Sequence, residues 1–172
     1  MASIRSGIGE NMEDRYLFKA KRTDNGEWVI GNLITNVFFR LGQSIPYILC
    51  SDKAEYDCFE DFTEENGIFE VRPDAICQCT GLKDKNGKLI WENDIMVAHL
   101  DEDYPENETY IRILWCGSGL CSIENRSKDI APSHASSAGC SSAPCPLDKF
   151  DTEHFEVCGN IFDSPELLES EG

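Results

Sequence analysis

The chain has 172 residues and a formal net charge of −17, from 15 Lys and Arg against 32 Asp and Glu. This acidity excludes a simple binder of nucleic-acid phosphates and disfavours an anionic membrane surface, because both depend on Lys and Arg. With a hydrophobic fraction of 41%, the length predicts a buried core in one compact domain or two small ones, rather than global disorder.

Residues 1–14 lack hydrophobic periodicity, which predicts that they form a disordered leader. No segment has the composition of a signal peptide or a membrane span, so we expect a cytoplasmic protein. Its nine cysteines are then expected to be reduced rather than paired. Cys50, Cys58, Cys77 and Cys158 lie among apolar or aromatic residues, where a thiol packs as a small hydrophobic group.

A β-hairpin is predicted over residues 17–34, where apolar and polar residues partly alternate on both sides of a turn. The turn contains Asn25 and Gly26, which tolerate a positive φ. Pro73 is expected to separate two strands. The short strands expected after the hairpin are 37–40, 46–51, 69–71 and 75–80, with an acidic loop at 55–67.

The central segment carries two predicted turns. Asn86 and Gly87 form a polar turn before an apolar pair. In the second turn, Asn93 tolerates a left-handed conformation, and Asp94 can accept hydrogen bonds from nearby backbone N–H groups. A strand is expected from Ile95 onward.

The last third predicts more strands and one short helix. Its expected segments are an acidic loop at 101–108, a strand pair at 110–116 and 120–124, a flexible Ser-, Ala-, Pro- and Cys-rich insertion at 126–149, and a strand at 155–162. The helix has Ser164 as its N-cap and Pro165 as its first residue. Many short strands without long helical periodicity predict a mostly β fold.

Three stretches carry a family resemblance: residues 16–31 (YLFKAKRTDNGEWVIG), 78–95 (QCTGLKDKNGKLIWENDI) and 155–168 (FEVCGNIFDSPELL). In their order and spacing, they resemble the YopX family of phage and prophage proteins over residues 15–168. Two departures stand out. The insertion is unusually long, and Asn93 stands where the family often has Gly.

The resemblance implies a mostly β protein of several short coiled β-sheets, with an SH3-like barrel in the C-terminal half and a short C-terminal helix. The implied parts are an N-terminal β subdomain at 15–76, a barrel subdomain at 77–168 that carries the insertion, and a tail at 169–172. It also implies a phage or prophage accessory protein in the bacterial host cell, a possible homo-oligomer, and no established catalytic residues.

The shared motifs are structural in character. Turns are expected at Thr80-Gly81-Leu82 and Asn86-Gly87, core positions at Trp91 and Ile95, and a C-terminal clasp at Val157, Ile161, Leu167 and Leu168. The full set of expected structural residues is Trp28, Gly31, Thr80, Gly81, Leu82, Asp84, Asn86, Gly87, Trp91, Asp94, Ile95, Gly159, Asn160, Ile161, Pro165, Leu167 and Leu168.

A structural zinc site is one alternative for the cysteines. Cys116 and Cys121 are separated by four residues, as are Cys140 and Cys145, with His134 as a spare ligand. Two residues between paired cysteines is the commoner spacing, and the second pair lies in the expected insertion. Incidental free thiols, with no metal and no cofactor, are therefore the expected state.

No catalytic motif is present. The chain lacks a nucleophile elbow, a His-Glu-x-x-His pair and a phosphate-binding loop, so we expect no enzymatic activity. His99, His134 and His154 are scattered along the chain. Cys77 and Cys79 would point the same way on a regular strand, as core or surface thiols rather than a redox pair.

The tryptophans Trp28, Trp91 and Trp115 lie in strand-like segments, where core packing is expected. With the basic run at residues 19–22, they leave a nucleic-acid-associated role as a minor alternative.

The favoured function is non-catalytic binding of an unidentified host or phage protein. A small-molecule or nucleotide-binding oligomer is the alternative. The negative charge is concentrated at residues 55–65, 101–108 and 166–171. An acidic surface of this kind can mimic nucleic acid or attract a basic partner. Neutralising residues 101–108 should then leave folding intact and weaken such a partner.

Overall fold

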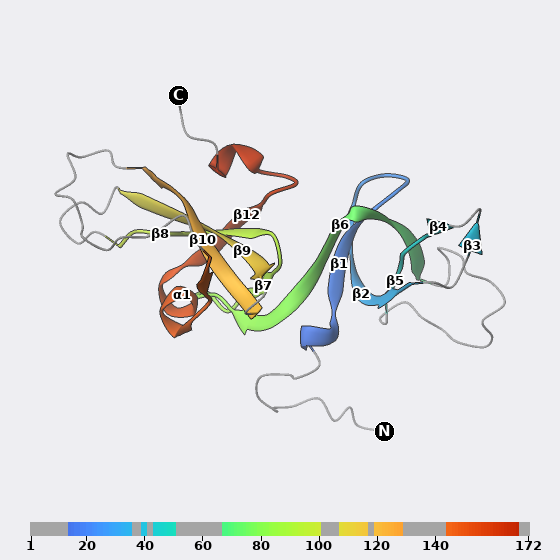
Figure 1. Cartoon of the computed structure of the whole chain (residues 1–172), viewed down its shortest axis with the longest axis horizontal. Helices are drawn as coiled ribbons and strands as arrows, with labels where there is room; N and C mark the ends of the chain where they lie inside the picture. Colours follow the sequence, from blue (N-terminus) through green and yellow to red (C-terminus); the bar gives the residue numbers. More distant parts are fainter. Residues whose placement is uncertain are drawn as a thin grey trace, which may run out of the picture. The chain divides into compact units, whose positions relative to one another are not determined.

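The computed structural model describes residues 14–35, 39–40, 43–50, 67–100, 107–116, 119–128 and 144–168. The chain divides into two units, Met1–Gly81 and Leu82–Gly172, built mostly from antiparallel strands (Figure 1). The mostly β prediction is confirmed. The acidic stretches at 55–65 and 101–106, the leader up to residue 13, and insertion residues 129–143 lie outside the described residues.

The first unit contains four strands whose pairings form a closed circuit. The strands are β1 (Phe18–Arg22), β2 (Trp28–Ile34), β5 (Tyr47–Leu49) and β6 (Ile68–Lys83). β1 pairs with β2, β2 with β5, β5 with β6, and β6 again with β1. The predicted hairpin is confirmed, with Gly26 at φ 74°. The remaining elements are the 3₁₀ helix η1 (Asp14–Tyr16) and the separate pair β3 (Phe39–Arg40) and β4 (Gln43–Ser44).

The circuit encloses the core of the first unit. The buried side chains are Ala20, Ile48, Cys50, Phe69 and Val71, with Phe18, Val29, Leu33 and Ile76 packed against them. Gly31 is buried where β2 meets β5, and a Cβ built on it would lie 2.6 Å from the carbonyl carbon of Leu49. No side chain fits there, which explains glycine at this position.

The strand β6 is longer than the sequence predicted. Pro73 does not separate two strands, and β6 runs through it. The reason is a bulge: Arg22 pairs with Val71 and Ala20 with Ile76, so residues 72–75 lie opposite a single residue of β1. A proline is tolerated in a bulge because no ladder hydrogen bond needs its missing N–H.

The prediction of a turn at residues 80–82 is also wrong, because this segment belongs to β6. Gly81 has φ 76°, a conformation that glycine adopts without steric cost. The two units divide directly after Gly81. The predicted division between residues 76 and 77 falls within the same strand.

The second unit is built on a five-stranded antiparallel sheet in the order β11-β10-β9-β8-β12. Its elements are β7 (Leu89–Trp91), β8 (Asp94–Ala98), β9 (Glu108–Cys116), β10 (Gly119–Lys128), β11 (Cys145–Pro146), α1 (Lys149–His154), β12 (Glu156–Asn160) and the 3₁₀ helix η3 (Pro165–Leu168). β7 pairs with the end of β6. Among the described residues, no helix is long and apolar enough to cross a membrane.

Two predictions for the second unit differ from what the described residues show. The insertion was expected to begin at residue 126, but β10 continues to Lys128, and β11 and α1 occupy the other end of the segment. Long-range pairing with β9 stabilises this polar strand end, which local composition does not indicate. The SH3-like barrel is not shown, because the pairings of this sheet do not close on themselves among the described residues.

The strand β8 is buried on both faces of the sheet. On one face, Met96 and Ala98 pack with Ile111, Ile113 and Phe155. The opposite face buries Ile95, Val97 and Tyr110 under the C-terminal residues Ile161, Leu167 and Leu168. The C-terminal segment, including the predicted short helix, therefore covers one face of the sheet.

We predict that Gly31→Ala strongly destabilises the first unit. The added methyl group would overlap the Leu49 carbonyl backbone, and overpacking of this kind costs about 1–3 kcal/mol or more. Urea denaturation followed by circular dichroism measures the loss. Ile30→Ala is the matched control, because its neighbouring side chain is 49% exposed. Equal stability of the two variants would contradict the tight approach of β2 and β5.

Candidate functional site

The outer face of the β1–β2 hairpin brings together two lysines, a tryptophan and an isoleucine. Side chains alternate between the two faces of a strand, so Ala20 points into the core while its neighbours Lys19 and Lys21 point away from it. Lys21 lies opposite Trp28, and Lys19 lies opposite Ile30. We call these four residues the hairpin face.

Electrostatic contacts organise the hairpin face. The Nζ atoms of Lys19 and Lys21 lie 5.2 Å and 5.5 Å from the centroid of the Trp28 ring. Both distances are within the range of cation–π attraction, which holds the ammonium groups over the indole. Ile30, 49% exposed, adds an apolar surface directly beside this pair of charges.

Arg22, the third cation of the basic run, has a structural role instead. Its guanidinium forms a bidentate pair with Asp24, at 2.8 Å and 2.5 Å, across the hairpin turn. It also lies 4.4 Å from the centroid of the Phe69 ring. The hydrogen bond from Arg22 lowers the pKa of Asp24. Arg22 therefore fixes the turn, while the two lysines supply the charge of the hairpin face.

The prediction that the three tryptophans pack in the core is confirmed for one of them only. Trp91 is buried, at 6% exposure, as predicted. Trp115, near the end of β9, is 46% exposed, which corrects its assignment to the core. Trp28 is half-buried under the lysines rather than in the core. The alternating register of the hairpin was the signal that could have grouped Trp28 with Ile30.

Asp84 holds a turn of the shared motifs through its buried carboxylate. Its carboxylate is 5% exposed and accepts three backbone N–H groups, from Asn86, Lys88 and Val157, each at 2.9 Å. It therefore shapes the Asn86-Gly87 turn and attaches that turn to β12. Gly87 has φ 82°, as the predicted turn requires.

The second predicted turn is confirmed at Asn93, which has φ 67°. Its N–H donates to Ile113 O at 2.8 Å, and its carbonyl accepts from Ile161 N at 3.1 Å. Asp94 is 2% exposed and accepts from the Trp91 N–H at 2.9 Å, as predicted. This turn therefore links β8, β9 and the C-terminal segment.

The C-terminal clasp is confirmed for Ile161, Leu167 and Leu168, which pack on one face of the sheet. Val157 is a correction, since it packs against the opposite face. Regular alternation would place residues 157 and 161 on the same face, and the register shift between Val157 and Gly159 interrupts it. A Cβ on Gly159 would lie 3.0 Å from the Ser164 side chain, so glycine permits the close return of the chain. The remaining motif residues are Asn160, which accepts from the N–H groups of Phe162 and Asp163, Pro165 at the start of η3, half-buried Thr80, and Leu82 at 38% exposure.

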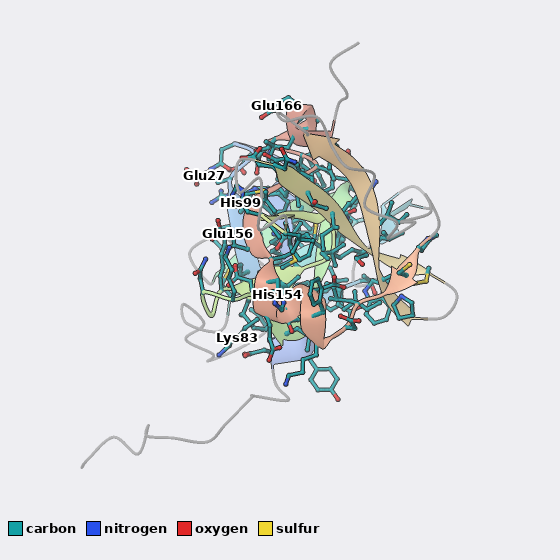
Figure 2. The ribbon with its side chains drawn as sticks, turned by 90° about the vertical axis from the view of Figure 1, so that its left-hand side faces the viewer. Glu27, Lys83, His99, His154, Glu156 and Glu166 are labelled. Atoms are coloured by element: carbon teal, nitrogen blue, oxygen red, sulfur yellow. A yellow bond between two sulfur atoms is a disulfide. The ribbon has the colours of Figure 1, made fainter. Side chains whose placement is uncertain are left out.

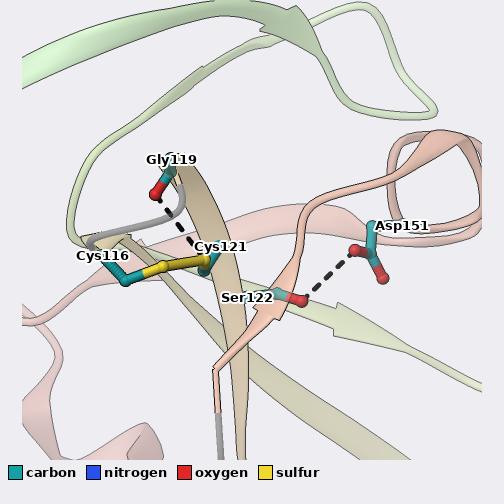
Figure 3. Close-up of a disulfide and its surroundings, with 5 residues drawn as sticks. All are labelled: Cys116, Gly119, Cys121, Ser122 and Asp151. Carbon is teal, nitrogen blue, oxygen red and sulfur yellow. Dashed lines mark hydrogen bonds between the residues drawn. A yellow bond between two sulfur atoms is a disulfide. The ribbon is translucent and has the colours of Figure 1, made fainter.

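The expectation of free thiols is wrong for one pair, because Cys116 and Cys121 form a disulfide across the β9–β10 turn (Figure 3). The antiparallel register brings their Cα atoms to 6.4 Å, a proximity that sequence spacing alone does not establish. This pairing removes two of the four thiolates of the zinc alternative. Cys145 is exposed, and Cys140 and His134 lie outside the described residues.

The prediction that thiols pack as small hydrophobic groups has different outcomes among the other described cysteines. Cys50, Cys77 and Cys79 are buried, and the last two point to the same face of β6 as predicted for a regular strand. For Cys158 the prediction is wrong, because this residue is exposed. Its sulfur donates to Ile95 O at 3.4 Å, and desolvation raises the pKa of the thiol to about 11, so it remains protonated.

Two of the three histidines, His99 and His154, lie in the described residues. His154 projects from α1, where its ring stacks on Phe150 with centroids 4.1 Å apart and its Nδ1 lies 3.0 Å from Phe150 O (Figure 2). His99 is exposed. Within the described ranges, no group of three His, Cys, Asp or Glu residues could hold a metal ion.

The helix α1 was not predicted, although its start carries a local signal. Asp148 is the N-cap, and its side chain accepts from the Asp151 N–H, while the Asp151 side chain accepts from the Asp148 N–H. This reciprocal pair is a capping box formed by two aspartates. Ser122 Oγ also donates to Asp151 at 3.3 Å (Figure 3). Partial burial raises the pKa of Asp151.

Comparison with known proteins places these features in a family. A family model described as "YopX protein" matches residues 17–169, nearly the whole chain. The chain is also similar to protein EF1440 from Enterococcus faecalis, known from a crystal structure. The two are 23% identical, with 88% of this chain and 96% of that chain covered and a TM-score of 0.42. No curated protein matches the chain.

We predict that Asp84→Asn destabilises the second unit by about 1–3 kcal/mol. The amide replaces one acceptor oxygen by a donor and leaves a buried backbone N–H unsatisfied. Urea denaturation measures the change. Glu156→Gln is the matched carboxylate-to-amide control, because this side chain contacts Asn86 at the surface. A loss in the control as large as in Asp84→Asn would contradict the special role of the buried carboxylate.

Asp151 generates a pH-dependent prediction. Its folded pKa is raised, so the folded state binds this proton more readily and the ionised carboxylate reduces stability at neutral pH. That penalty fades as the pH falls through the raised pKa toward the ordinary value of 3.8.

Asp151→Asn keeps an acceptor for both of its hydrogen bonds and removes the charge. We expect it to be more stable than the wild type at pH 7, by less than about 1 kcal/mol, with no advantage at about pH 4. Urea denaturation at both pH values tests this. Glu153→Gln, which removes a surface partner of Lys149, should give no such gain. A variant advantage that grows on acidification would contradict the sign.

Proposed function

The chain belongs to the YopX family, and we propose from this membership that it is a non-catalytic phage or prophage accessory protein that binds a host or phage protein in the bacterial cytoplasm. The hairpin face is the observation that carries the binding role. It combines two cations, a large aromatic ring and an exposed aliphatic side chain on one small surface. Tryptophans of this kind are frequent centres of protein interfaces.

The chemistry of the hairpin face favours a partner with a short acidic and apolar segment. Carboxylates of the partner would face Lys19 and Lys21, and an apolar side chain would cover Ile30. A long nucleic-acid strand fits less well for two reasons. The lysine ammonium groups already lie over the Trp28 ring, where a base would stack. The rest of a chain with net charge −17 also repels an extended polyanion.

The SH3-like fold of the second unit is part of the same proposal. Its support is the family membership together with five antiparallel strands and a 3₁₀ helix that packs on the sheet. Such a unit would serve as a binding scaffold rather than a catalytic one.

We predict that the double variant Lys19→Glu/Lys21→Glu binds an acidic partner segment at least about tenfold more weakly, because two attractive charges become repulsive. The probe is a fluorescein-labelled peptide of Asp, Glu and Leu, followed by fluorescence polarisation. A single-stranded oligonucleotide of equal formal charge is the comparison ligand, and we expect it to bind more weakly than the peptide.

Lys149→Glu is the matched control. This lysine is highly exposed and lies on α1 in the second unit, so its reversal should leave peptide affinity unchanged. Circular dichroism checks that the variants remain folded. Unchanged peptide affinity in the double variant, or preferential binding of the oligonucleotide, would overturn the proposed mode of binding.

A further inference from the structure

Arg112 is a half-buried cation in the second unit that forms no ion pair with the described residues. It lies on β9, opposite Ile95 of β8 and Ile123 of β10. Strand alternation places it on the same face as Tyr110, within the region that the C-terminal residues cover. Nothing in the sequence motifs singled out this arginine.

The donors of Arg112 are only partly used. Its Nη2 donates to Asn93 Oδ1 at 2.7 Å, and that amide oxygen carries no net charge. Its Nε is closed to solvent and has no hydrogen-bond acceptor, the one such buried side-chain atom among the described residues. A buried donor without an acceptor, on a cation without an anion, is energetically costly.

Three carboxylates of the second unit accept hydrogen bonds from neutral donors. Glu108 accepts from the Tyr110 hydroxyl at 2.8 Å, and Asp94 accepts from the Trp91 N–H at 2.9 Å. Asp163 accepts from Asn160 Nδ2 at 2.8 Å. Within the described part of the chain, no carboxylate forms an ion pair with Arg112. An external anion could therefore supply what this guanidinium lacks.

We propose that Arg112 and the Asn93 turn form a binding site for a small oxyanion, a phosphate or carboxylate group. A planar guanidinium presents its N–H groups as a fork that matches two oxygens of such a group. One oxygen would accept from Nε and the second from the adjacent Nη edge, after a small rotation of the flexible stem opens Nε. The site lies in the second unit, so it is independent of the hairpin face in the first.

Thermal unfolding with inorganic phosphate or sodium acetate, against sodium chloride at matched ionic strength, tests this site. At ten times the dissociation constant, the bound anion should raise the wild-type Tm by about 3 °C. Arg112→Met should lose this response. The exposed Arg72, paired with Asp74 in the first unit, provides the control: Arg72→Met should retain it. The larger response of the two anions identifies phosphate or carboxylate as the preferred ligand.

Asn93→Asp provides a second test that does not require removal of the arginine. Its carboxylate would occupy the position of the amide oxygen, 2.7 Å from Arg112 Nη2, and supply the missing charge. We expect a higher Tm in chloride and a loss of the anion response. Broadening of the free-phosphate ³¹P signal by wild type, but not by Arg112→Met, would show binding directly. No anion response in wild type, or an equal response in Arg112→Met, would overturn the proposal.

Discussion

The continuous backbone of β6 is the constraint on which both units depend. Its first part closes the circuit of strands with β1 and β5, and its end pairs with β7. The strand accommodates Pro73 in a bulge and has a positive φ at Gly81. Asp84 then fixes the following turn and attaches it to β12 through three backbone hydrogen bonds.

The charged groups are used in a way that net charge does not reveal. Asp84 and Asp94 are buried as acceptors for backbone N–H groups, so part of the negative charge is structural. Two of the few cations lie over Trp28, and a third, Arg112, is half-buried beside a neutral amide. A strongly acidic chain therefore carries two local groups of positive charge, one in each unit, and we propose a different anionic ligand for each.

Local sequence signals predicted the turns and much of the strand pattern because their causes are local. Asn93 adopts a left-handed conformation, which its residue type tolerates. Asp94 accepts a hydrogen bond from the N–H of Trp91, three residues away. The hairpin around Gly26 follows from turn chemistry and alternation. Pro73 and α1 were missed for a different reason: a bulge depends on the partner strand, and a two-aspartate capping box is a weak local pattern.

The sequence by itself determined the mostly β class, the turns at Gly26, Gly87 and Asn93, the core residues Trp91 and Ile95, and the family membership. Each of these depends on residue type and short-range spacing. Only the tertiary structure decided that Cys116 pairs with Cys121, that Trp115 is exposed, and that the hairpin face and Arg112 are candidate binding sites. These features depend on strand register and on which face the rest of the chain covers, and contacts between distant residues set both.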